Sequence, residues 1–257
     1  MRSLHNAKKI VIKVGTSTLT FANGSLNLRR IDELTRVISD IKNSGKEVLL
    51  VTSGAISVGT QNLGLSERPN DIPGKQAMSS IGQCKLMNIY DEFFRKYNHT
   101  IGQALLTKDI VENAEMHKNT LNTFETLLKY KVIPIINAND TVSVEETSLD
   151  NDTLSAHVAN IVKADLLILL TDVDGLYDKH PKEDGAKLLQ EVHEITDDIK
   201  NNVHGAGSVH GIGGMITKVA AAEIASKSGT KTIIMNGNNP LLIYNLLEGE
   251  KIGTIFH

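Results

Sequence analysis

Cysteine is nearly absent from this chain, since Cys84 is the only one among its 257 residues. A single cysteine cannot form an internal disulfide, and a chain without disulfides suits a reducing compartment. Cys84 lies in a segment that we expect to be helical, where a packing role is commoner than a nucleophilic one.

Long hydrophobic runs are also missing. The sequence opens with the basic stretch "MRSLHNAKK", but the apolar run that follows is only a few residues long and contains Lys13. Such a run is too short for a signal peptide, and no later stretch approaches the length of a membrane span. We therefore expect a cytoplasmic protein that does not bind a membrane.

An excess of positive charge is lacking as well, because the formal net charge is −3. Such a chain has no basic field for nucleic acid, so we expect no nucleic-acid partner, and local groups have to bind any anionic ligand. With 40 % hydrophobic and 22 % charged residues, the composition is that of a soluble globular protein. The length suffices for one large α/β domain or two small ones.

Familiar nucleotide-binding and catalytic motifs do not occur. The sequence contains no G-x-x-x-x-G-K-[ST] phosphate loop, no H-E-x-x-H zinc motif and no G-x-S-x-G nucleophile elbow. The glycines at 205, 207, 211, 213 and 214 miss the G-x-G-x-x-G pattern, because His210 occupies one required position. These absences argue against a Walker-type nucleotide site, a zinc site, an α/β-hydrolase and a nicotinamide-dependent oxidoreductase.

Short β-branched runs recur along the chain, at residues 9–14, 47–52, 132–137, 166–171 and 231–235. Runs that are apolar on both faces are typical of strands in a parallel sheet covered by helices on both sides. Helical periodicity fills the intervals, at residues 28–43, 76–97, 117–130, 152–164, 215–228 and 240–247. This alternation predicts an α/β fold, a three-layer α/β/α sandwich with an open, mostly parallel central sheet, as one domain spanning residues 1–257. Residues 140–149 alternate and predict a small ribbon outside the core.

Small and polar residues follow several of the predicted strands. Lys13 and Gly15 end the first strand, Ser53 and Gly54 open a helix after the second, and "NAND" and "TDVDGLY" follow the next two. In open parallel sheets, ligands bind at the carboxyl ends of the strands, and helix N-terminal amides bind anions. We expect a phosphate site there, although a tight turn explains either glycine taken alone.

Two lysines lie where only an anionic ligand accounts for them. Lys13 lies inside an apolar strand, and Lys218 lies in the first turn of a helix that follows the glycine-rich stretch "GAGSVHGIGG". A cation in that turn opposes the helix dipole by roughly 0.3–1 kcal/mol, and a bound anion would reverse the sign. A flexible loop with a solvated lysine is the alternative for Lys218.

Carboxylate and amide side chains supply the remaining candidates. Asp150, Asn151 and Asp152 begin a predicted helix, where capping explains one of them but not all three. Asp152 could instead bridge the two lysines. Asn139 and Asp140 could bind the amino group of a substrate or make an Asx turn.

Seven motifs in order resemble the amino acid kinase family, and within it the glutamate 5-kinase branch: "VIKVGTS", "VTSGAISVG", "KQAMSSIGQ" with "GQALLT", "PIINANDTV", "DNDTLSA", "LLTDVDGLYDKHP" and "GIGGMITK". The resemblance covers essentially the whole sequence. It implies ATP-dependent phosphorylation of the γ-carboxylate of L-glutamate in the first step of proline biosynthesis, with Mg²⁺ bridging the ATP phosphates. It also implies feedback inhibition by proline and a homo-oligomer, either a dimer or a tetramer.

The same resemblance assigns roles to individual residues. The catalytic residues would be Lys13 and Lys218, which contact the transferring phosphoryl group, and Asp152, which organises them. An N-terminal lobe of about residues 1–165 would bind glutamate through Ser53, Gly54, Asp140 and Asn151. A C-terminal lobe of about residues 166–257 would bind the nucleotide. The ATP-binding residues would be Lys13, Gly15, Thr171, Asp172, Ile212, Gly213, Gly214, Met215, Ile216, Thr217 and Lys218, and no protein ligand for a metal is expected.

Two positions depart from the family pattern. Ile212 stands where a threonine is usual, so no hydroxyl contact is expected there, and Ala138 replaces the glutamate of N-E-N-D, so it receives no role. Many relatives continue into an RNA-binding-type domain, whereas this sequence ends at "GTIFH", so we expect a kinase domain alone.

Two alternatives stay open on the same fold. One is a related kinase acting on N-acetylglutamate, aspartate, carbamate or uridine monophosphate, and the motifs "INANDTV" and "DNDTLSA" favour glutamate over these acceptors. The other is a non-catalytic amino-acid sensor, and the retention of Lys13, Lys218 and Asp152 together argues against it.

Overall fold

One sheet runs through the part of the chain that the computed structural model describes, residues 4–21, 23–142, 149–181, 183–200 and 214–257. Within these residues it has eight strands in the order β3-β4-β2-β1-β5-β7-β8-β6. The strands are β1 (Lys9–Val14), β2 (Glu47–Val51), β3 (Ile101–Leu106), β4 (Ile133–Ala138), β5 (Leu166–Thr171), β6 (Glu191–Val192), β7 (Lys231–Asn236) and β8 (Thr254–Phe256). All neighbouring pairs are parallel except β7 with β8. The predicted open, mostly parallel sheet is confirmed.

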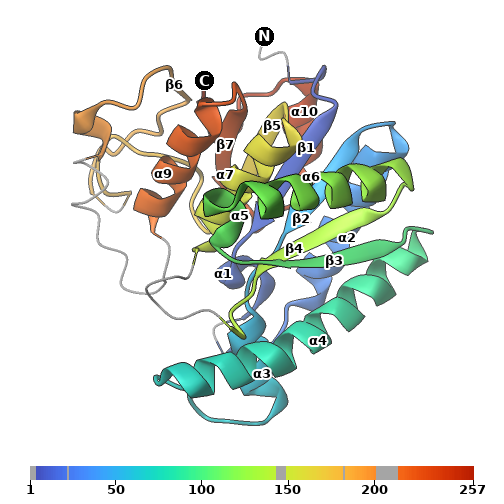
Figure 1. The fold of residues 1–257 in the computed structure, drawn as a ribbon. Coiled ribbons are helices and arrows are strands. Elements are labelled where there is room, and N and C mark those ends of the chain that lie inside the picture. The colour runs from blue at the N-terminus through green and yellow to red at the C-terminus, as the bar shows by residue number, and fades with distance from the viewer. Residues whose placement is uncertain (1–3, 22, 143–148, 182, 201–213) are drawn as a thin grey trace.

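Helices cover both faces of this sheet (Figure 1). They are α1 (Thr16–Leu19), α2 (Leu28–Asn43), α3 (Ala55–Asn62), α4 (Ile72–Lys96), α5 (Asp109–Glu112), α6 (Ala114–Lys129), α7 (Asn151–Val162), α9 (Met215–Ser226) and α10 (Leu242–Glu248). Buried residues of α2, α3, α4 and α10 share one hydrophobic cluster with the sheet, and those of α6, α7 and α9 share another. Two separate cores on the two faces of one sheet make the predicted three-layer sandwich.

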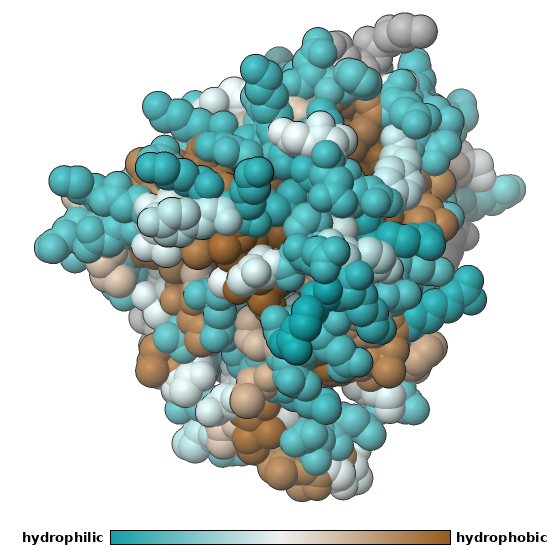
Figure 2. Space-filling view, turned by 90° about the vertical axis from the view of Figure 1, so that its right-hand side faces the viewer, coloured by the Kyte–Doolittle hydropathy of each residue, from teal (hydrophilic) through white to brown (hydrophobic). Residues whose placement is uncertain are grey.

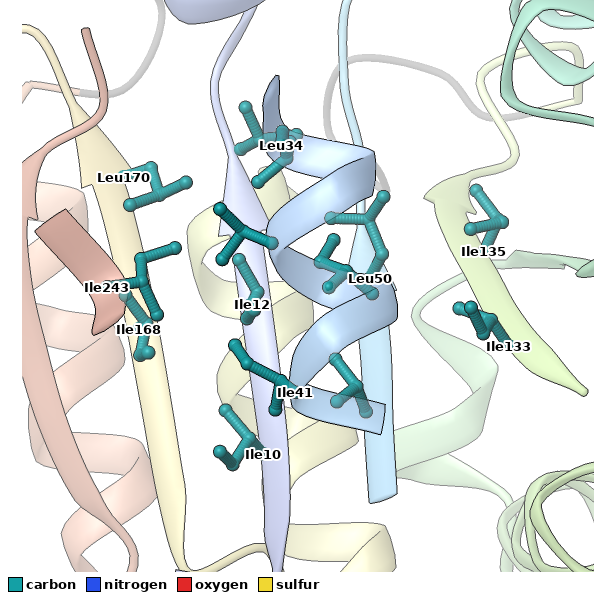
Figure 3. Packing of buried hydrophobic residues seen from close by; sticks show 14 of the residues in the cluster. Ile10, Ile12, Leu34, Ile41, Leu50, Ile133, Ile135, Ile168, Leu170 and Ile243 are labelled. Carbon is teal, nitrogen blue, oxygen red and sulfur yellow. The ribbon is translucent and has the colours of Figure 1, made fainter. Parts of the chain in front are cut away.

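Alternate residues of the central strand β1 serve the two cores. Ile10 and Ile12 pack with α2 and α10 in the cluster that Figure 3 draws. Val11 belongs to the other cluster, with α7 and α9. Because successive side chains of a strand point to opposite faces, Lys13 points to the α7 and α9 side. The alternation of side chains along β1 therefore places Lys13 on the face of the sheet that α7 and α9 cover.

Several elements differ from the sequence-based expectation in extent or existence. The predicted strands and helices are present with shifted ends; α4 begins at Ile72 because the side chain of Asp71 caps it by accepting from the Gly74 N–H. The sequence does not predict β3, β6 or β8, because "IGQALL" contains polar and glycine residues and the other two strands are very short. Most of the ribbon predicted at residues 140–149 lies outside the described residues.

Helices α3 and α4 cross at two glycines. A Cβ atom at Gly59 would lie 1.9 Å from the carbonyl oxygen of Met78, and a Cβ atom at Gly82 would lie 1.8 Å from that of Ala55. Neither distance is compatible with a side chain, so the close approach of the two backbones requires glycine on both helices. This crossing fixes α3, whose first turn follows Ser53 and Gly54.

Replacing Gly82 with alanine should force α3 and α4 apart and lower the free energy of unfolding by about 3 kcal/mol, because the clash is with backbone that cannot rotate away. Urea unfolding followed by circular dichroism measures the loss. Ser80→Ala, at an exposed position of the same helix, is the matched control and should change stability by less than about 0.5 kcal/mol. A Gly82→Ala protein as stable as the control would contradict the close crossing.

The surface is mainly hydrophilic on the face drawn in Figure 2, where hydrophobic residues form separate patches. Among the described residues, we find no helix with both the length and the apolar character that crossing a membrane requires. Cys84 lies on α4 as expected, but it is exposed, so the predicted packing role is wrong. The two preceding residues, Gly82 and Gln83, are the ones that this turn of α4 buries.

Candidate active site

Lys13 lies near the carboxyl end of β1, between β2 and β5 in the sheet. The residue is 6 % exposed, so its ammonium group has little access to water. The N-termini of α7 and α9 begin at the same edge of the sheet, because each helix leads back to the start of the following parallel strand. A buried ammonium group at this edge requires a negative partner from one of these helices.

Asp152 of α7 is that partner, and it binds both lysines. Its Oδ1 lies 2.6 Å from the Nζ of Lys13, and its Oδ2 lies 3.1 Å from the Nζ of Lys218, in the first turn of α9. The Thr217 hydroxyl donates to the same Oδ2 at 2.7 Å. Asp152 and Lys218 are 2 % and 6 % exposed. One buried carboxylate thus faces two buried ammonium groups, so positive charge is in excess at this point.

The pKa shifts follow from this crowding. Burial by itself would raise the pKa of Asp152, but the charges of Lys13 and Lys218 and the hydrogen bonds from Lys13 and Thr217 hold it below its ordinary value. Burial lowers the pKa of Lys13; the Asp152 carboxylate opposes this shift, and the Lys218 ammonium adds to it. An anion bound beside Lys13 would raise the pKa of Lys13 again, because it would balance the second positive charge.

The polar residues that begin α7 make different contacts. Asp150 caps the helix, since its Oδ1 accepts from the backbone N–H groups of Asp152 and Thr153 at 3.0 Å each. Asn151 Oδ1 accepts from the backbone N–H of Ala138 at 3.2 Å, which joins α7 to the end of β4. Capping therefore accounts for Asp150 alone, and Asp152 is left to bind the lysines.

The turn after β2 brings the ends of β1 and β2 together. The Ser53 hydroxyl donates to the carbonyl oxygen of Val14 at 2.9 Å and accepts from the Thr16 hydroxyl at 3.3 Å. Gly54 precedes α3 with φ of +92°, in the left-handed region that glycine adopts readily. The first N–H groups of α3 therefore begin beside the strand that carries Lys13.

Asp140 lies just beyond β4 and is partly buried. Burial raises the pKa of its carboxyl group, and the positive charge of Arg68 opposes that shift. Arg68 belongs to the segment between α3 and α4, so this segment and the end of β4 face each other across the two charges. The sequence gives no reason to single out Arg68.

Gln83 and Asn137 form a buried pair that sequence reasoning misses. The Asn137 amide donates to Gln83 Oε1 at 2.9 Å, and Asn137 Oδ1 accepts from the backbone N–H of Ala138 at 3.0 Å. The pair fixes the end of β4 against α4. One signal could have found it, because Gln83 lies at helical spacing with Ser79, Leu86 and Tyr90 on the buried face of α4.

The residues expected to bind ATP lie at the same edge of the sheet. Thr171 ends β5 and its hydroxyl donates to the carboxylate of exposed Asp172 at 3.1 Å. Gly15 precedes α1, and a Cβ there would lie 3.7 Å from the Nζ of Lys13, an ordinary contact. The start of α9 supplies the other described candidates, which are Gly214 at its N-cap followed by Met215, Ile216, Thr217 and Lys218. Ile212 and Gly213 lie outside the described residues.

The strand order divides these candidates into two groups with Lys13 between them. Ser53, Asp140 and Asn151 belong to the β2 and β4 side of β1, and the expected ATP residues belong mostly to the β5 and α9 side. Two ligands bound at these two groups would meet at the paired lysines. Excess positive charge at that point suits transfer of an anionic group from one ligand to the other.

Curated relatives match this chain over nearly its whole length. A glutamate 5-kinase of Clostridium perfringens (strain 13 / Type A) is 51 % identical over 261 residues, which cover 99 % of this chain and 97 % of the relative. A glutamate 5-kinase of Listeria monocytogenes serotype 4b (strain CLIP80459) is 50 % identical, covering 99 % of this chain and 94 % of the relative. One of Ligilactobacillus salivarius (strain UCC118) is 49 % identical, covering 100 % and 98 %.

Solved structures share the fold at low sequence identity. The carbamate kinase of Giardia lamblia bound to AMP-PNP has a TM-score of 0.70 at 18 % identity, covering 98 % of this chain and 99 % of that one. The isopentenyl phosphate kinase of T. acidophilum, a product complex, has a TM-score of 0.67 at 17 % identity, covering 97 % and 100 %. Residues 8–236 also match the family model described as "Amino acid kinase family". On this match and on the close relatives, the chain belongs to the amino acid kinase family.

Proposed function

We propose that this chain transfers the γ-phosphoryl group of ATP to the γ-carboxylate of L-glutamate, forming L-glutamyl 5-phosphate and ADP. The observation that carries the phosphoryl transfer is the buried Asp152 carboxylate between the Nζ atoms of Lys13 and Lys218. The choice of glutamate is supported by relatives named glutamate 5-kinase, which are 49–51 % identical.

The reaction needs no general base. The γ-carboxylate of glutamate is ionised at neutral pH, so one of its oxygens can attack the γ-phosphorus of ATP directly. The new oxygen–phosphorus bond forms as the bond from γ-phosphorus to the β,γ-bridging oxygen breaks, and the electron pair of that bond leaves with ADP. No proton is transferred. Catalysis then consists of aligning the two substrates and neutralising charge on the phosphoryl oxygens.

Lys13 and Lys218 supply that neutralisation in this mechanism. Both ammonium groups are held on one carboxylate, so they can contact the transferring phosphoryl group from two sides without first being ordered. Asp152 acts as a positioning residue, because it sets the separation of the lysines and does not itself meet the substrate. The Thr217 hydroxyl supports Asp152 through its hydrogen bond to Oδ2.

The two groups of candidate residues become the two substrate sites. Glutamate is assigned to Ser53, Gly54, Asn151 and Asp140, with the Asp140 carboxylate binding the α-ammonium group. ATP is assigned to the β5 and α9 side, with Gly15, Thr171, Asp172 and residues 214–218; Ile212 and Gly213 stay predictions from the resemblance. The chain itself does not crowd Gly15, which agrees with a glycine kept for the approach of a ligand.

Mg²⁺ enters this proposal with ATP. Both oxygens of Asp152 already bind Lys13, Lys218 and Thr217, so this carboxylate is not available as a metal ligand. The site therefore fits an ion carried by the ATP phosphates, where it would neutralise part of their charge.

The wider setting is proposed on the resemblance to the family. The product would enter proline biosynthesis in the cytoplasm, and proline would inhibit the enzyme through the glutamate site. The chain would act as a dimer or tetramer, with an amino-acid lobe over about residues 1–165 and a nucleotide lobe over about residues 166–257.

Release of ADP with a panel of acceptors tests the proposal, with hydroxylamine present to trap the labile acyl phosphate. Glutamate should yield ADP and trapped product in equal amounts. N-acetylglutamate, aspartate, carbamate and uridine monophosphate should yield neither above background. Trapping with N-acetylglutamate but not glutamate would overturn the substrate assignment, and no ADP release with any acceptor would favour a non-catalytic sensor.

Asp140→Asn is expected to raise KM for glutamate by about 10–150-fold with little change in kcat, because a charge-assisted hydrogen bond to the ammonium group contributes about 1.5–3 kcal/mol. Burial raises the pKa of Asp140, so on acidification it should lose its charge at a higher pH than an ordinary aspartate. KM of the wild type should therefore rise as the pH falls through that pKa. The variant should show only the titration of glutamate itself.

Initial rates at varied glutamate concentration and pH measure this difference. Asp198→Asn, the same change at an exposed aspartate, is the control and should leave KM and its pH profile unchanged. If KM for glutamate depends on pH in the same way in the wild type and in Asp140→Asn, the role given to Asp140 is contradicted.

A further inference from the structure

A second cluster of titratable side chains lies at the edge of the sheet farthest from β3, where β6 pairs with β8. The two strands are parallel, with Glu191 opposite Ile255 and Val192 opposite Phe256. The residue after each strand is a histidine, so this register brings His193 beside His257. Glu191 lies two residues before His193 and projects from the same face of the strand. In Figure 1 the C-terminus lies beside β6.

The three side chains converge on one point. The Nε2 atom of His193 lies 3.7 Å from Oε2 of Glu191, and the Nε2 atom of His257 lies 3.9 Å from the same oxygen. The imidazole rings stack, with centroids 4.5 Å apart and planes inclined by 18°. Both nitrogen–oxygen distances exceed a hydrogen bond but lie within the range of an ion pair, and both rings turn the same nitrogen to one carboxylate.

A shared metal ion would draw the same atoms together. Each imidazole binds an ion in its own ring plane, so the exposed rings would rotate out of their stacked arrangement when the ion binds. In a tetrahedral zinc site with bonds of about 2.0–2.2 Å, neighbouring ligand atoms lie about 3.3–3.6 Å apart. The observed separations of 3.7 and 3.9 Å are close to that range, and the ligand atoms of all three residues lie within 4.8 Å of one another. Two imidazoles and one carboxylate are ligands that zinc and its neighbours in the first transition row prefer, whereas Mg²⁺ prefers oxygen ligands alone.

The backbone beneath the cluster is fixed. The N–H of His257 donates to the carbonyl oxygen of Val192 at 3.1 Å, and the N–H of Ile255 donates to that of Gln190 at 3.0 Å. Ligands on paired strands, or directly beside them, keep their spacing better than ligands on loops. Of the residues that the structure describes, these three are the only group of histidine, cysteine or carboxylate side chains placed to share an ion.

We propose that Glu191, His193 and His257 form a binding site for a divalent transition metal of the zinc class, with water completing the coordination. The site is separate from the paired lysines, because β5, β7 and β8 lie between β1 and β6 in the sheet. A bound ion would join β6 to the residue that follows β8. The proposed metal site does not depend on the function proposed above, since none of its residues takes part in that reaction.

Zinc titration of metal-free protein carrying no affinity tag tests the site. Isothermal calorimetry should show one Zn²⁺ per chain, and Co²⁺ should produce the intense visible absorption of a tetrahedral nitrogen and oxygen site. His193→Ala is the main variant, because the 73 % exposed side chain can be removed without disturbing the core. It should weaken Zn²⁺ binding by about 10-fold or more, and Glu191→Gln should do likewise.

His117→Ala, which removes an exposed histidine from α6, is the matched control and should bind Zn²⁺ as the wild type does. Circular dichroism in the presence of a chelator should show all variants equally folded. An absence of stoichiometric binding by the wild type would overturn the proposal. So would an affinity that His193→Ala and Glu191→Gln leave unchanged.

Discussion

Lys13→Met is expected to give a folded protein whose rate of phosphoryl transfer is lower by about 10²–10³-fold. Removing one preorganised donor from a developing anion costs about 3–4 kcal/mol of transition-state stabilisation. Folding should persist, because Asp152 keeps its contacts with the Nζ of Lys218 and the hydroxyl of Thr217. Steady-state ADP release measures the rate, and circular dichroism with urea unfolding measures the fold.

Lys13→Arg separates charge from shape at the same position. A planar guanidinium cannot replace a compact ammonium group 2.6 Å from Asp152 in so buried a place, so this variant should also be slow. Lys46→Met, at a lysine that bonds backbone carbonyls near the start of β1, is the matched control and should keep full turnover. Near-wild-type turnover by a folded Lys13→Met protein would remove Lys13 from the mechanism.

Asp152→Asn is expected to have the largest effect, because it damages both stability and catalysis. The change leaves two buried ammonium groups facing each other without a counter-charge, and breaking a buried pair in this way costs about 3–5 kcal/mol. The Asp152 carboxylate raises the pKa of Lys13, so without it Lys13 should lose its proton more readily and turnover should fall by at least about 10²-fold. Urea unfolding and initial rates at neutral pH measure the two losses.

The stability of Asp152→Asn should also depend less on pH than that of the wild type. The pKa of Asp152 is lower in the folded than in the unfolded chain, so the unfolded state binds the proton more readily. Its stabilising contribution is therefore complete above the ordinary aspartate pKa of about 3.9 and is lost as the pH falls below it. In the control Asp198→Asn, the free energy of unfolding should depend on pH as it does in the wild type. Equal stability of the two variants at neutral pH would show that Asp152 does not bind the lysines as described.

Most of the layer architecture can be predicted from the sequence, because the strands of a covered parallel sheet are apolar on both faces. Runs such as "KIVIKV" and "LLILLT" identify themselves by composition alone. The strand β3 does not, since "IGQALL" is only partly buried and carries Gly102 and Gln103. Strands β6 and β8 are too short for any periodicity, and their places depend on pairing with distant segments.

The candidate site can also be predicted only in part from the sequence. Lys13, Asp152 and Lys218 can be suspected because each is unusual in its own segment, but their meeting depends on the strand order. The hydrogen bond between Gln83 and Asn137 joins residues 54 positions apart, and the only local sign of it is a polar residue on an apolar helix face. Likewise, nothing near Gly82 in the sequence reveals that the backbone of α3 passes against it.

The central place of β1 also bears on how the chain folds as it is synthesised. One neighbour, β2, follows closely, but the other, β5, begins so late that the bond from the Lys9 N–H to Asp165 spans 156 residues. At about 5–20 residues per second, a ribosome takes roughly 10–30 s to produce that second neighbour. Throughout this interval the segment "IVIKV" has an unpaired edge and both apolar faces incompletely covered. We therefore expect a holding chaperone to bind this stretch of the nascent polypeptide until β5 pairs with it.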